Sequence, residues 1–365
     1  MNTIDVNGKS KWGTIIIGAG QAGLAAGYYL LKSDEDFLIL DAAENIGDSW
    51  RKRWDSLRLF TPSQYDGLPG FSFPAPRNTM PSKDEMADYL EKYAEKFKLP
   101  VRMGVKVNHL SKSESGFELN TTDLVFKCDR VIVATGTNPI PRVPEFAKDL
   151  NKNVLQIHSS QYFNPNSLPQ GNVLVVGAGT SGVEIAIELA KSRPTFISGH
   201  PTFHIPEPVF RYAGRLYWWF VSNILTVRTP IGRQAKKSIV KGGGPLVNVS
   251  VKDLVDAGVE QVPRVAGVAN GNPILEDDRE LVVSSIVWAT GFKPDFSWVD
   301  LKITDENNGW PKTNRGVSTE IEGMYFIGML FLYGLTSGLV GGVGRDAAYI
   351  AQHIHQHING NHRLK

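Results

Sequence analysis

The chain has 365 residues, and its 42% hydrophobic content suits one or two packed domains and excludes a disordered or fibrous protein. Its 39 Lys and Arg nearly balance its 37 Asp and Glu, so the net charge of +2 gives no general case for a nucleic-acid partner. The one cysteine, Cys128, cannot form an internal disulfide, a CxxC redox pair or a zinc cluster, so we expect no metal site and a reducing, cytoplasmic location.

The first predicted element is a buried strand over residues 14–17, after a polar start that lacks the apolar core of a signal peptide. Gly18, Gly20 and Gly23 follow it and open an Ala- and Leu-rich helix. In this context the glycines allow a sharp turn, a close approach of a pyrophosphate and tight packing of helix on strand. The next apolar strand ends at Asp41, which can accept hydrogen bonds from ribose hydroxyls, so the unit predicts a dinucleotide site.

A loop and a second kind of strand end come next. Residues 62–81 carry five prolines and predict a loop, and Ser82 is placed to cap the helix that follows. A strand over 131–133 ends in Ala134-Thr135-Gly136 and is followed by prolines. We expect the end of that strand to approach another group closely.

The strand–glycine–helix pattern recurs about 150 residues later, which predicts a second dinucleotide-binding domain. Here the strand over 172–176 leads into Gly177, Gly179 and Gly182. The strand after the helix ends at Ser198-Gly199-His200, without the acid that favours a free ribose 2′-hydroxyl and without an arginine that would clamp a 2′-phosphate. We therefore expect a relaxed choice between NADPH and NADH.

The longest apolar stretch, Leu216 to Val227, is shorter than the roughly 20 residues that a membrane span needs, so no span is expected. Its aromatic residues are expected to pack in a core or to line a pocket; a membrane-touching surface or a homodimer contact are the alternatives.

A second Ala-Thr-Gly follows the strand over 286–288, and a glycine-dense segment over 334–344 leads into the last helix. The simplest plan inserts the second dinucleotide domain, residues 166–285, into a first domain formed by 1–165 and 286–365. The predicted fold class is thus α/β, with two Rossmann-like domains of which one is inserted into the other.

Two dinucleotide sites in one chain indicate that a hydride moves from one cofactor to the other, with a flavin carrying the chemistry. A disulfide reductase passes electrons to a cysteine pair, which this chain lacks. Molecular oxygen is then the natural acceptor, and a small molecule the natural substrate.

These motifs resemble those of the flavin-containing and Baeyer–Villiger monooxygenase superfamily, and the chain is especially similar to its short bacterial CzcO-like branch. The resemblance extends over essentially the whole chain. It is carried by the two glycine motifs, both Ala-Thr-Gly segments, Gly47-Asp48-Ser49-Trp50, 57–62 and 341–346.

The resemblance implies FAD at the first motif and NADP at the second. The implied FAD contacts are Gly18, Gly20, Gln21, Ala22, Gly23, Asp41, Gly47, Ser49, Trp50, Leu59, Thr61, Gln64, Val107, Thr135, Gly136 and Gly328. The implied NAD(P) contacts are Gly177, Gly179, Thr180, Ser181, Gly182, Ser198, His200, Thr290 and Gly291. The implied activity is class B monooxygenation, in which NAD(P)H reduces FAD, a C4a-hydroperoxyflavin forms away from water, and a small sulfur or nitrogen compound or a ketone is oxygenated.

The chain departs from the family pattern near its expected catalytic residues. The fingerprint FxGxxxH keeps its histidine, His158, but has Lys152 and Val154 at the Phe and Gly positions. The asparagine that supports the peroxyflavin has no evident counterpart, and Gln64 is the nearest amide. Gln64 and His158 are the catalytic candidates, although a structural role for His158 in the interdomain linker is favoured. An NAD(P)H oxidase that forms hydrogen peroxide, and a nucleotide-binding sensor or transport accessory, stay as alternatives.

Overall fold

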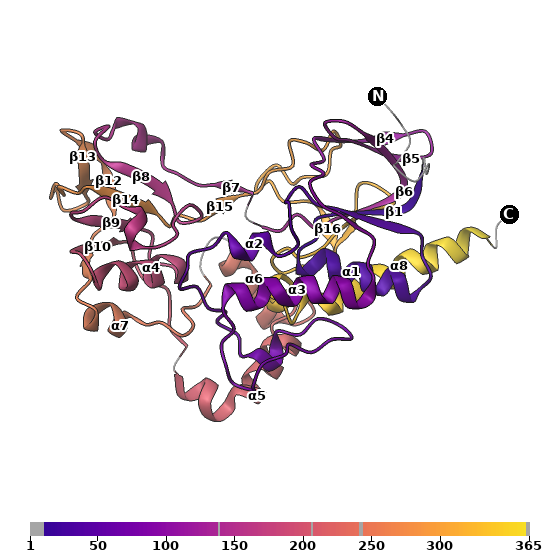
Figure 1. The fold of residues 1–365 in the computed structure, drawn as a ribbon, viewed down its shortest axis with the longest axis horizontal. Helices are drawn as coiled ribbons and strands as arrows, with labels where there is room; N and C mark the ends of the chain where they lie inside the picture. The colour runs from indigo at the N-terminus through magenta and orange to yellow at the C-terminus, as the bar shows by residue number, and fades with distance from the viewer. Residues whose placement is uncertain (1–10, 138, 206, 241–243, 363–365) are drawn as a thin grey trace.

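The computed structural model describes residues 11–137, 139–205, 207–240 and 244–362. Two domains lie side by side, each built around its own β-sheet (Figure 1). The chain crosses between them at β7 (Ile140–Pro141) and β15 (Phe292–Lys293), which pair with each other as short antiparallel strands. The chain thus leaves the first domain and returns to it, as the expected insertion requires.

The first domain contains a nine-stranded sheet with a parallel centre. Five strands are parallel in the order β3-β2-β1-β6-β18, with bounds β3 (Val101–Arg102), β2 (Phe37–Leu40), β1 (Trp12–Ile17), β6 (Val125–Val133) and β18 (Met324–Phe326). Antiparallel strands extend it: β4 (His109–Ser113), β5 (Gly116–Asn120), β16 (Thr313–Asn314) and β17 (Val317–Ser318). All of β2 and the last four residues of β1 are buried, as expected for strands covered on both faces.

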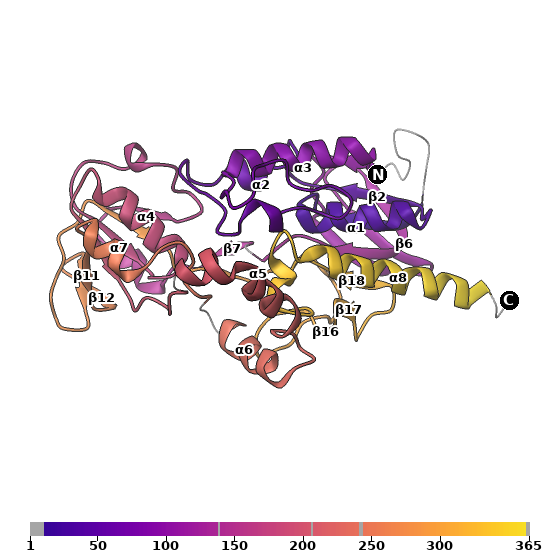
Figure 2. The same cartoon turned by 90° about the horizontal axis from the view of Figure 1, so that it is seen from below.

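Three long helices pack on one face of this sheet, as Figure 2 shows. They are α1 (Gln21–Lys32), α3 (Lys83–Phe97) and α8 (Val343–His362), with the shorter α2 (Asp48–Arg51), η1 (Ser63–Tyr65) and η4 (Leu335–Gly338) beside them. The expected cap of α3 is confirmed: the Ser82 hydroxyl accepts from the Glu85 amide, and the Glu85 carboxylate accepts from the Ser82 amide.

The second domain has a five-stranded, fully parallel sheet. Its order is β11 (Glu260–Val262), β10 (Thr195–Ser198), β9 (Val173–Val176), β14 (Ser285–Trp288) and β8 (Leu155–His158). Around it lie α4 (Thr180–Ala190), α7 (Val251–Asp256), η2 (Glu145–Asp149), η3 (Pro165–Ser167) and the hairpin β12 (Val265–Ala269) and β13 (Asn272–Leu275). Both domains are therefore Rossmann-like, as the glycine motifs predict.

The limits of the inserted domain differ from the expected 166–285. Strand β14 pairs with β9 on one side and with β8 on the other, so 155–158 and 285–288 both belong to the second sheet. With β7 and β15 as the two crossings, the inserted domain spans 142–291, and the expected limits are corrected accordingly.

Two helices of the inserted chain, α5 (Glu207–Asn223) and α6 (Pro230–Val240), leave the second sheet and pack on the first domain. The Val227 amide donates to the Tyr333 carbonyl at 2.8 Å, and the Leu335 amide donates to the Leu225 carbonyl at 2.9 Å. Within the described ranges, no helix is both long and apolar enough to cross a membrane.

Candidate functional site

The first glycine turn joins β1 to α1. Gly18 has a φ of +113°, which side chains strongly disfavour, and a Cβ there would lie 2.4 Å from the Ala134 carbonyl oxygen. A Cβ on Gly23 would lie 1.8 Å from the Gly18 carbonyl oxygen, so only glycine lets α1 pack this close. A Cβ on Gly20 would meet nothing within 4 Å. The first and third glycines therefore serve the fold, while the second leaves open space at the N-terminus of α1, where an anion is favoured.

Asp41 lies at the end of β2, beside this turn. One of its carboxylate oxygens accepts from the Ala19 amide at 2.6 Å and the other accepts from the Ala43 amide at 2.8 Å. The carboxylate thus holds the glycine turn against the loop after β2, where the ribose of a dinucleotide on this turn is expected.

Several other expected FAD residues lie near the first glycine turn or have an open backbone. Gln21 and Ala22 begin α1, and a Cβ on Gly328 would lie 2.7 Å from the Ala22 side chain, so these positions surround the turn. Gly136 has a φ of +77° and open space at its Cα.

The side chain of Leu59 is buried in the core under α1 and α3, whereas Ser49 is exposed. Because the Leu59 side chain is buried, a contact of Leu59 with a ligand would have to use its backbone. Trp50 packs on that same core, and Val107 packs on the core of the opposite sheet face. Gly47 has a φ of +88° at the N-terminus of α2.

The second glycine turn repeats the first almost atom for atom. Gly177 has a φ of +110°, and a Cβ on it would lie 2.4 Å from the Ala289 carbonyl oxygen. A Cβ on Gly182 would lie 1.8 Å from the Gly177 carbonyl oxygen, and one on Gly179 would meet nothing within 4 Å. Thr180 and Ser181 begin α4 behind this open position. The turn is thus a second open helix N-terminus of the same shape.

The end of β10 corrects one expected contact. The Gly18 amide donates to the carbonyl of Leu40, the residue before Asp41, and the Gly177 amide donates to the carbonyl of Ser198. Gly199 is therefore the counterpart of Asp41, and a side chain of any kind is missing there.

Ser198, which we expected to contact NAD(P), is only 1% exposed. Its hydroxyl donates to the Pro263 carbonyl at 2.9 Å and accepts from the Val265 amide at 3.1 Å. The side chain therefore faces into the domain, because it satisfies two backbone groups between β11 and β12, and it is not available to a ligand. His200 is exposed and stays a candidate.

His158 lies at the end of β8, next to the crossing strands. Its Nε2 lies 3.1 Å from the Gly291 carbonyl oxygen, its Nδ1 lies 2.9 Å from the Ser160 hydroxyl, and its ring meets Phe292 edge-on. Burial lowers the pKa of His158 below its usual value, which favours the neutral ring at pH 7. The Thr290 hydroxyl donates to the Arg142 carbonyl across the same crossing. These contacts favour a structural role for His158 in the linker.

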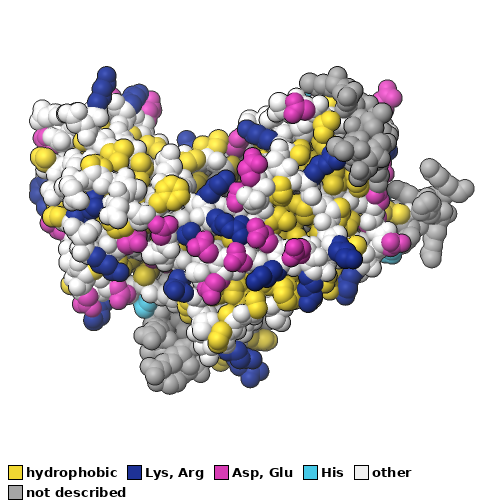
Figure 3. Space-filling model, in the orientation of Figure 1, with side chains coloured by type: hydrophobic (Ala, Val, Ile, Leu, Met, Phe, Trp, Pro, Cys, Tyr) yellow, Lys and Arg dark blue, Asp and Glu magenta, His cyan; other side chains and the backbone are white. Residues whose placement is uncertain are grey.

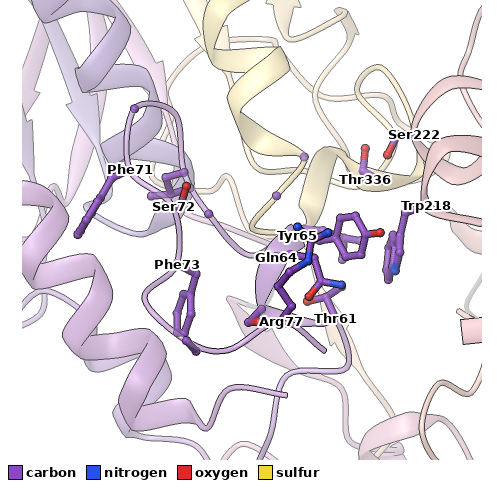
Figure 4. Close-up of a pocket in the computed structure, with 18 residues that line it drawn as sticks. Thr61, Gln64, Tyr65, Phe71, Ser72, Phe73, Arg77, Trp218, Ser222 and Thr336 are labelled. Atoms are coloured by element: carbon purple, nitrogen blue, oxygen red, sulfur yellow. The ribbon is translucent and has the colours of Figure 1, made fainter. Parts of the chain in front are cut away.

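A cavity of about 670 Å³ lies between the proline-rich loop, α5 and the segment before α8 (Figure 4). Its lining consists mainly of hydroxyl, amide and aromatic side chains together with glycines, namely Thr61, Ser63, Gln64, Tyr65, Gly67, Leu68, Gly70, Phe71, Ser72, Phe73, Ala75, Arg77, Trp218, Ser222, Thr336, Leu339, Gly341 and Gly342. A pocket of this size suits a small organic molecule.

The Gln64 amide, expected to be catalytic, lines this cavity but is already paired. Its Nε2 donates to the Asn78 side-chain oxygen at 2.8 Å, and its Oε1 accepts from the Asn78 amide at 2.7 Å. Asn78 has a φ of 64°, a conformation that asparagine tolerates better than most residues. The pair closes the loop over 64–78, and nothing in the sequence pattern pointed to Asn78.

A buried acid stands behind the cavity wall. The Thr61 hydroxyl donates to the Asp66 carboxylate, and Asp66 is fully buried. Burial raises the pKa of Asp66 to about 7, even though the bond from Thr61 lowers it. No sequence pattern pointed to Asp66, because burial of one acid in a proline-rich loop leaves no local pattern.

Two aromatic residues from distant segments meet at the cavity, as Figure 4 shows. The rings of Tyr65 and Trp218 have centroids 5.3 Å apart. Trp218 is buried and lines the cavity as expected of the aromatic stretch, whereas Trp219 and Phe220 of the same stretch are exposed.

Comparison with known proteins identifies the family. A family model described as "Pyridine nucleotide-disulphide oxidoreductase" matches residues 15–198. An "Uncharacterized oxidoreductase CzcO-like" of Geobacillus kaustophilus is 38% identical over 94% of this chain and 98% of its own length, and the CzcO oxidoreductase of Bacillus subtilis is 37% identical over 93% and 98%. This chain belongs to the pyridine nucleotide-disulphide oxidoreductase family and is a CzcO-like oxidoreductase.

More distant relatives of this CzcO-like chain are named as monooxygenases. YUCCA8 of Arabidopsis thaliana, described as a probable indole-3-pyruvate monooxygenase, is 30% identical over 95% of the chain and 90% of its own length. A flavin monooxygenase from Stenotrophomonas maltophilia, solved as a mutant with two substitutions, is 25% identical, covers 95% of this chain and 99% of its own, and has a TM-score of 0.80. Cyclohexanone monooxygenase has a TM-score of 0.71 at 17% identity, which shows the fold alone. The expected superfamily and fold class are thereby confirmed.

Proposed function

We propose that this CzcO-like oxidoreductase binds FAD at the turn over Gly18 to Gly23 and NADPH or NADH at the turn over Gly177 to Gly182, and that it is a monooxygenase of a small sulfur or nitrogen compound or a ketone. The observation that carries the proposal is the duplicated open glycine turn: Gly20 and Gly179 each leave clear space at a helix N-terminus. Two such sites on one chain favour hydride transfer between two dinucleotides.

The relatives support oxygenation over other flavin chemistry. YUCCA8 and the Stenotrophomonas maltophilia protein are both described as monooxygenases. An internal cysteine pair is excluded by the lone Cys128, and burial raises the pKa of its thiol to about 12, so it stays protonated.

The residues of this chain would bind and orient both cofactors. The amides at the starts of α1 and α4 would hold the two pyrophosphates, and Asp41 would orient the ribose at the first site. FAD, when bound, supplies the acceptor for the nicotinamide hydride and the reductant for molecular oxygen. The crossing strands β7 and β15, held by His158, connect the domain that would present the nicotinamide to the domain that would hold the flavin.

The cavity beside Gln64 is the proposed substrate site. Its wall of Tyr65 and Trp218 offers an apolar surface, while Thr61 leads to Asp66, whose pKa of about 7 suits the exchange of a proton near neutral pH.

One observation favours the oxidase alternative. Both polar atoms of the Gln64 amide are paired with Asn78, so Gln64 would support an oxygenated intermediate only after that pair opens. If the pair stays closed, Gln64 would offer no hydrogen bond to the oxygen chemistry, which favours release of hydrogen peroxide over an oxygenated product. A cytoplasmic location and a homodimer stay predictions.

The test reduces the purified, FAD-loaded protein anaerobically with NADPH or NADH, admits oxygen, and measures hydrogen peroxide together with the oxygenation of an organic sulfide and a cyclic ketone. A sulfoxide or ester formed in proportion to NAD(P)H consumed supports the proposal. Stoichiometric hydrogen peroxide without product would establish the oxidase, and no reduction of the flavin by either nicotinamide would leave a nucleotide-binding sensor.

A further inference from the structure

The charges of this chain are unevenly distributed along the sequence. Residues 208–252 contain no Asp or Glu, and they contain eight Lys and Arg, namely Arg211, Arg215, Arg228, Arg233, Lys236, Lys237, Lys241 and Lys252. The remainder of the chain has 31 Lys and Arg against 37 Asp and Glu, so it carries a net charge of −6. One continuous stretch thus supplies the excess of positive charge, although the net charge of the whole chain is only +2.

Six of these eight cations lie in α5, in α6 or between them, and we call residues 208–240, which follow the first α5 residue Glu207, the α5–α6 segment. In Figure 1 α5 lies at the lower edge of the molecule, away from both sheets. The space-filling view in Figure 3 shows hydrophobic and basic side chains together at that edge.

The outer face of α5 is apolar. Leu216 is 67% exposed, Trp219 is 55% exposed and Phe220 is 38% exposed, and the exposed Arg215 adjoins them. These four positions follow the i, i+1, i+4, i+5 spacing of a single helix face. An exposed cluster of large apolar side chains on one face is typical of an interaction surface.

The opposite face of α5 is already used inside the molecule. Trp218 and Val221 are buried, and Trp218 and Ser222 line the cavity. The Arg345 guanidinium donates to the Ser222 carbonyl at 2.6 Å and lies over the Tyr333 ring, which fixes the helix on the first domain. The apolar outer face therefore cannot turn inward without breaking these contacts.

Helix α6 adds cations and one more apolar side chain. Ile231 is 59% exposed, and Arg233, Lys236 and Lys237 are exposed on the same short helix. Leu, Trp and Phe next to Lys and Arg, without acids, form the composition of helices that lie in the interface of an anionic membrane.

We propose that the α5–α6 segment docks this protein on a membrane surface that contains anionic lipids, with Leu216, Trp219 and Phe220 entering the headgroup layer. The charge pattern favours this partner over a second copy, because a two-fold contact through this face would bring two acid-free, basic segments together. The two most exposed apolar side chains among the described residues of the segment, Leu216 and Ile231, are aliphatic, and aliphatic side chains fit lipid better than nucleic acid, which is bound through cations and stacking rings.

Docking would also place the cavity next to the membrane surface. Because one helix carries the lipid-facing residues on its outer face and Trp218 and Ser222 on its inner face, the cavity would lie directly behind the membrane contact. Docking itself does not depend on the proposed monooxygenase activity.

The experiment measures co-sedimentation of the purified full chain with vesicles of phosphatidylcholine alone and of phosphatidylcholine with phosphatidylglycerol. We expect binding to the anionic vesicles that weakens as salt rises. The double variant Leu216→Ser/Trp219→Ser should lose it, and Arg215→Gln/Lys237→Gln should weaken it by about fivefold per cation removed. Circular dichroism and thermal unfolding show whether each variant folds.

Two matched controls decide the result. Val255→Ser/Val282→Ser removes exposed apolar side chains elsewhere (61% and 74% exposed), and Lys106→Gln/Lys302→Gln removes exposed cations elsewhere, so both should bind like the parent. Equal loss in either control, or no binding to anionic vesicles, would overturn the proposal. If instead Leu216→Ser/Trp219→Ser changes the solution mass from dimer to monomer and no vesicles are bound, a second copy covers the face and the lipid proposal is wrong.

Discussion

The two glycine turns are nearly superimposable in their constraints and differ at one residue. In both, the first glycine has a positive φ near 110°, a Cβ on the third would lie 1.8 Å from a carbonyl oxygen, and a Cβ on the second would meet nothing within 4 Å. The order of four strands around them also matches, β3-β2-β1-β6 against β11-β10-β9-β14, whereas the fifth strand, β18 or β8, comes from opposite ends of the two domains' chain segments. Yet the first site ends in Asp41 and the second in Gly199. The comparison teaches that the same three glycines shape both turns, and we expect the residue at the next strand end to influence which dinucleotide each turn binds.

The largest effect is expected from the third glycine of each turn. In Gly23→Ala or Gly182→Ala the new methyl group would collide with a backbone carbonyl, so unfolding free energy should fall by about 1–3 kcal/mol or more and the bound dinucleotide should be lost. Denaturant unfolding with flavin absorbance measures both. A variant that keeps full stability would show that the turn relaxes easily and that the close approach is not required.

The second glycines should separate binding from folding. Gly20→Ala should weaken FAD and Gly179→Ala should weaken the nicotinamide dinucleotide, by about tenfold or more, because each methyl group fills the space that the pyrophosphate needs. The free energy of unfolding should change little, since the new methyl group meets no protein atom within 4 Å. Titration of each ligand, with Gly23→Ala and Gly182→Ala for comparison, measures the contrast. If the second-glycine and third-glycine variants lowered stability and ligand affinity equally, the second glycines would not have a separate role in binding.

The next variant makes the second site resemble the first. Gly199→Asp places an acid at the counterpart of Asp41, so NADPH should lose about tenfold in affinity relative to NADH through repulsion of its 2′-phosphate. The φ of Gly199 is +119°, which strains any side chain, so Gly199→Ala is the matched control for that strain. An unchanged ratio of NADPH to NADH affinity between these two variants would contradict the assigned counterpart.

The smallest effect concerns an acid on the second helix. Glu184 follows Gly182 by two residues, whereas Ala25 has the same place after Gly23. Burial raises the pKa of Glu184 to about 7. Because the folded state then holds a proton that the unfolded state has released, stability should fall as pH rises from about 4.5 to about 7 and level off above it.

Glu184→Gln should flatten that part of the profile. Unfolding measured from pH 4.5 to pH 8 in both proteins provides the check, with Glu188→Gln as a control on the same helix. A parent and a variant with the same pH dependence would show that Glu184 titrates normally.

Much of the site followed from the sequence because its determinants are adjacent residues. Gly18 to Gly23 and Gly177 to Gly182 each set a turn and a helix start within six positions, and Ser82 with Glu85 sets the start of α3. The pairing of the Ser198 side chain could not be predicted because strand β10 is almost entirely buried, so its pattern gives no sign of which partner a side chain has. The expected limits of the inserted domain differ from the observed ones for a related reason: an Ala-Thr-Gly motif follows a strand in each sheet, so the motif does not show to which sheet the strand belongs.

The sequence alone determined that this chain builds two dinucleotide turns and lacks the cysteines for disulfide chemistry, because those properties depend on neighbouring residues and on composition. Tertiary structure decided the rest. It paired Gln64 with Asn78, brought Trp218 to Tyr65, and left Leu216 and Trp219 facing solvent. Each of these outcomes depends on a partner, or on the lack of cover, that lies far away along the chain, and no local pattern encodes it.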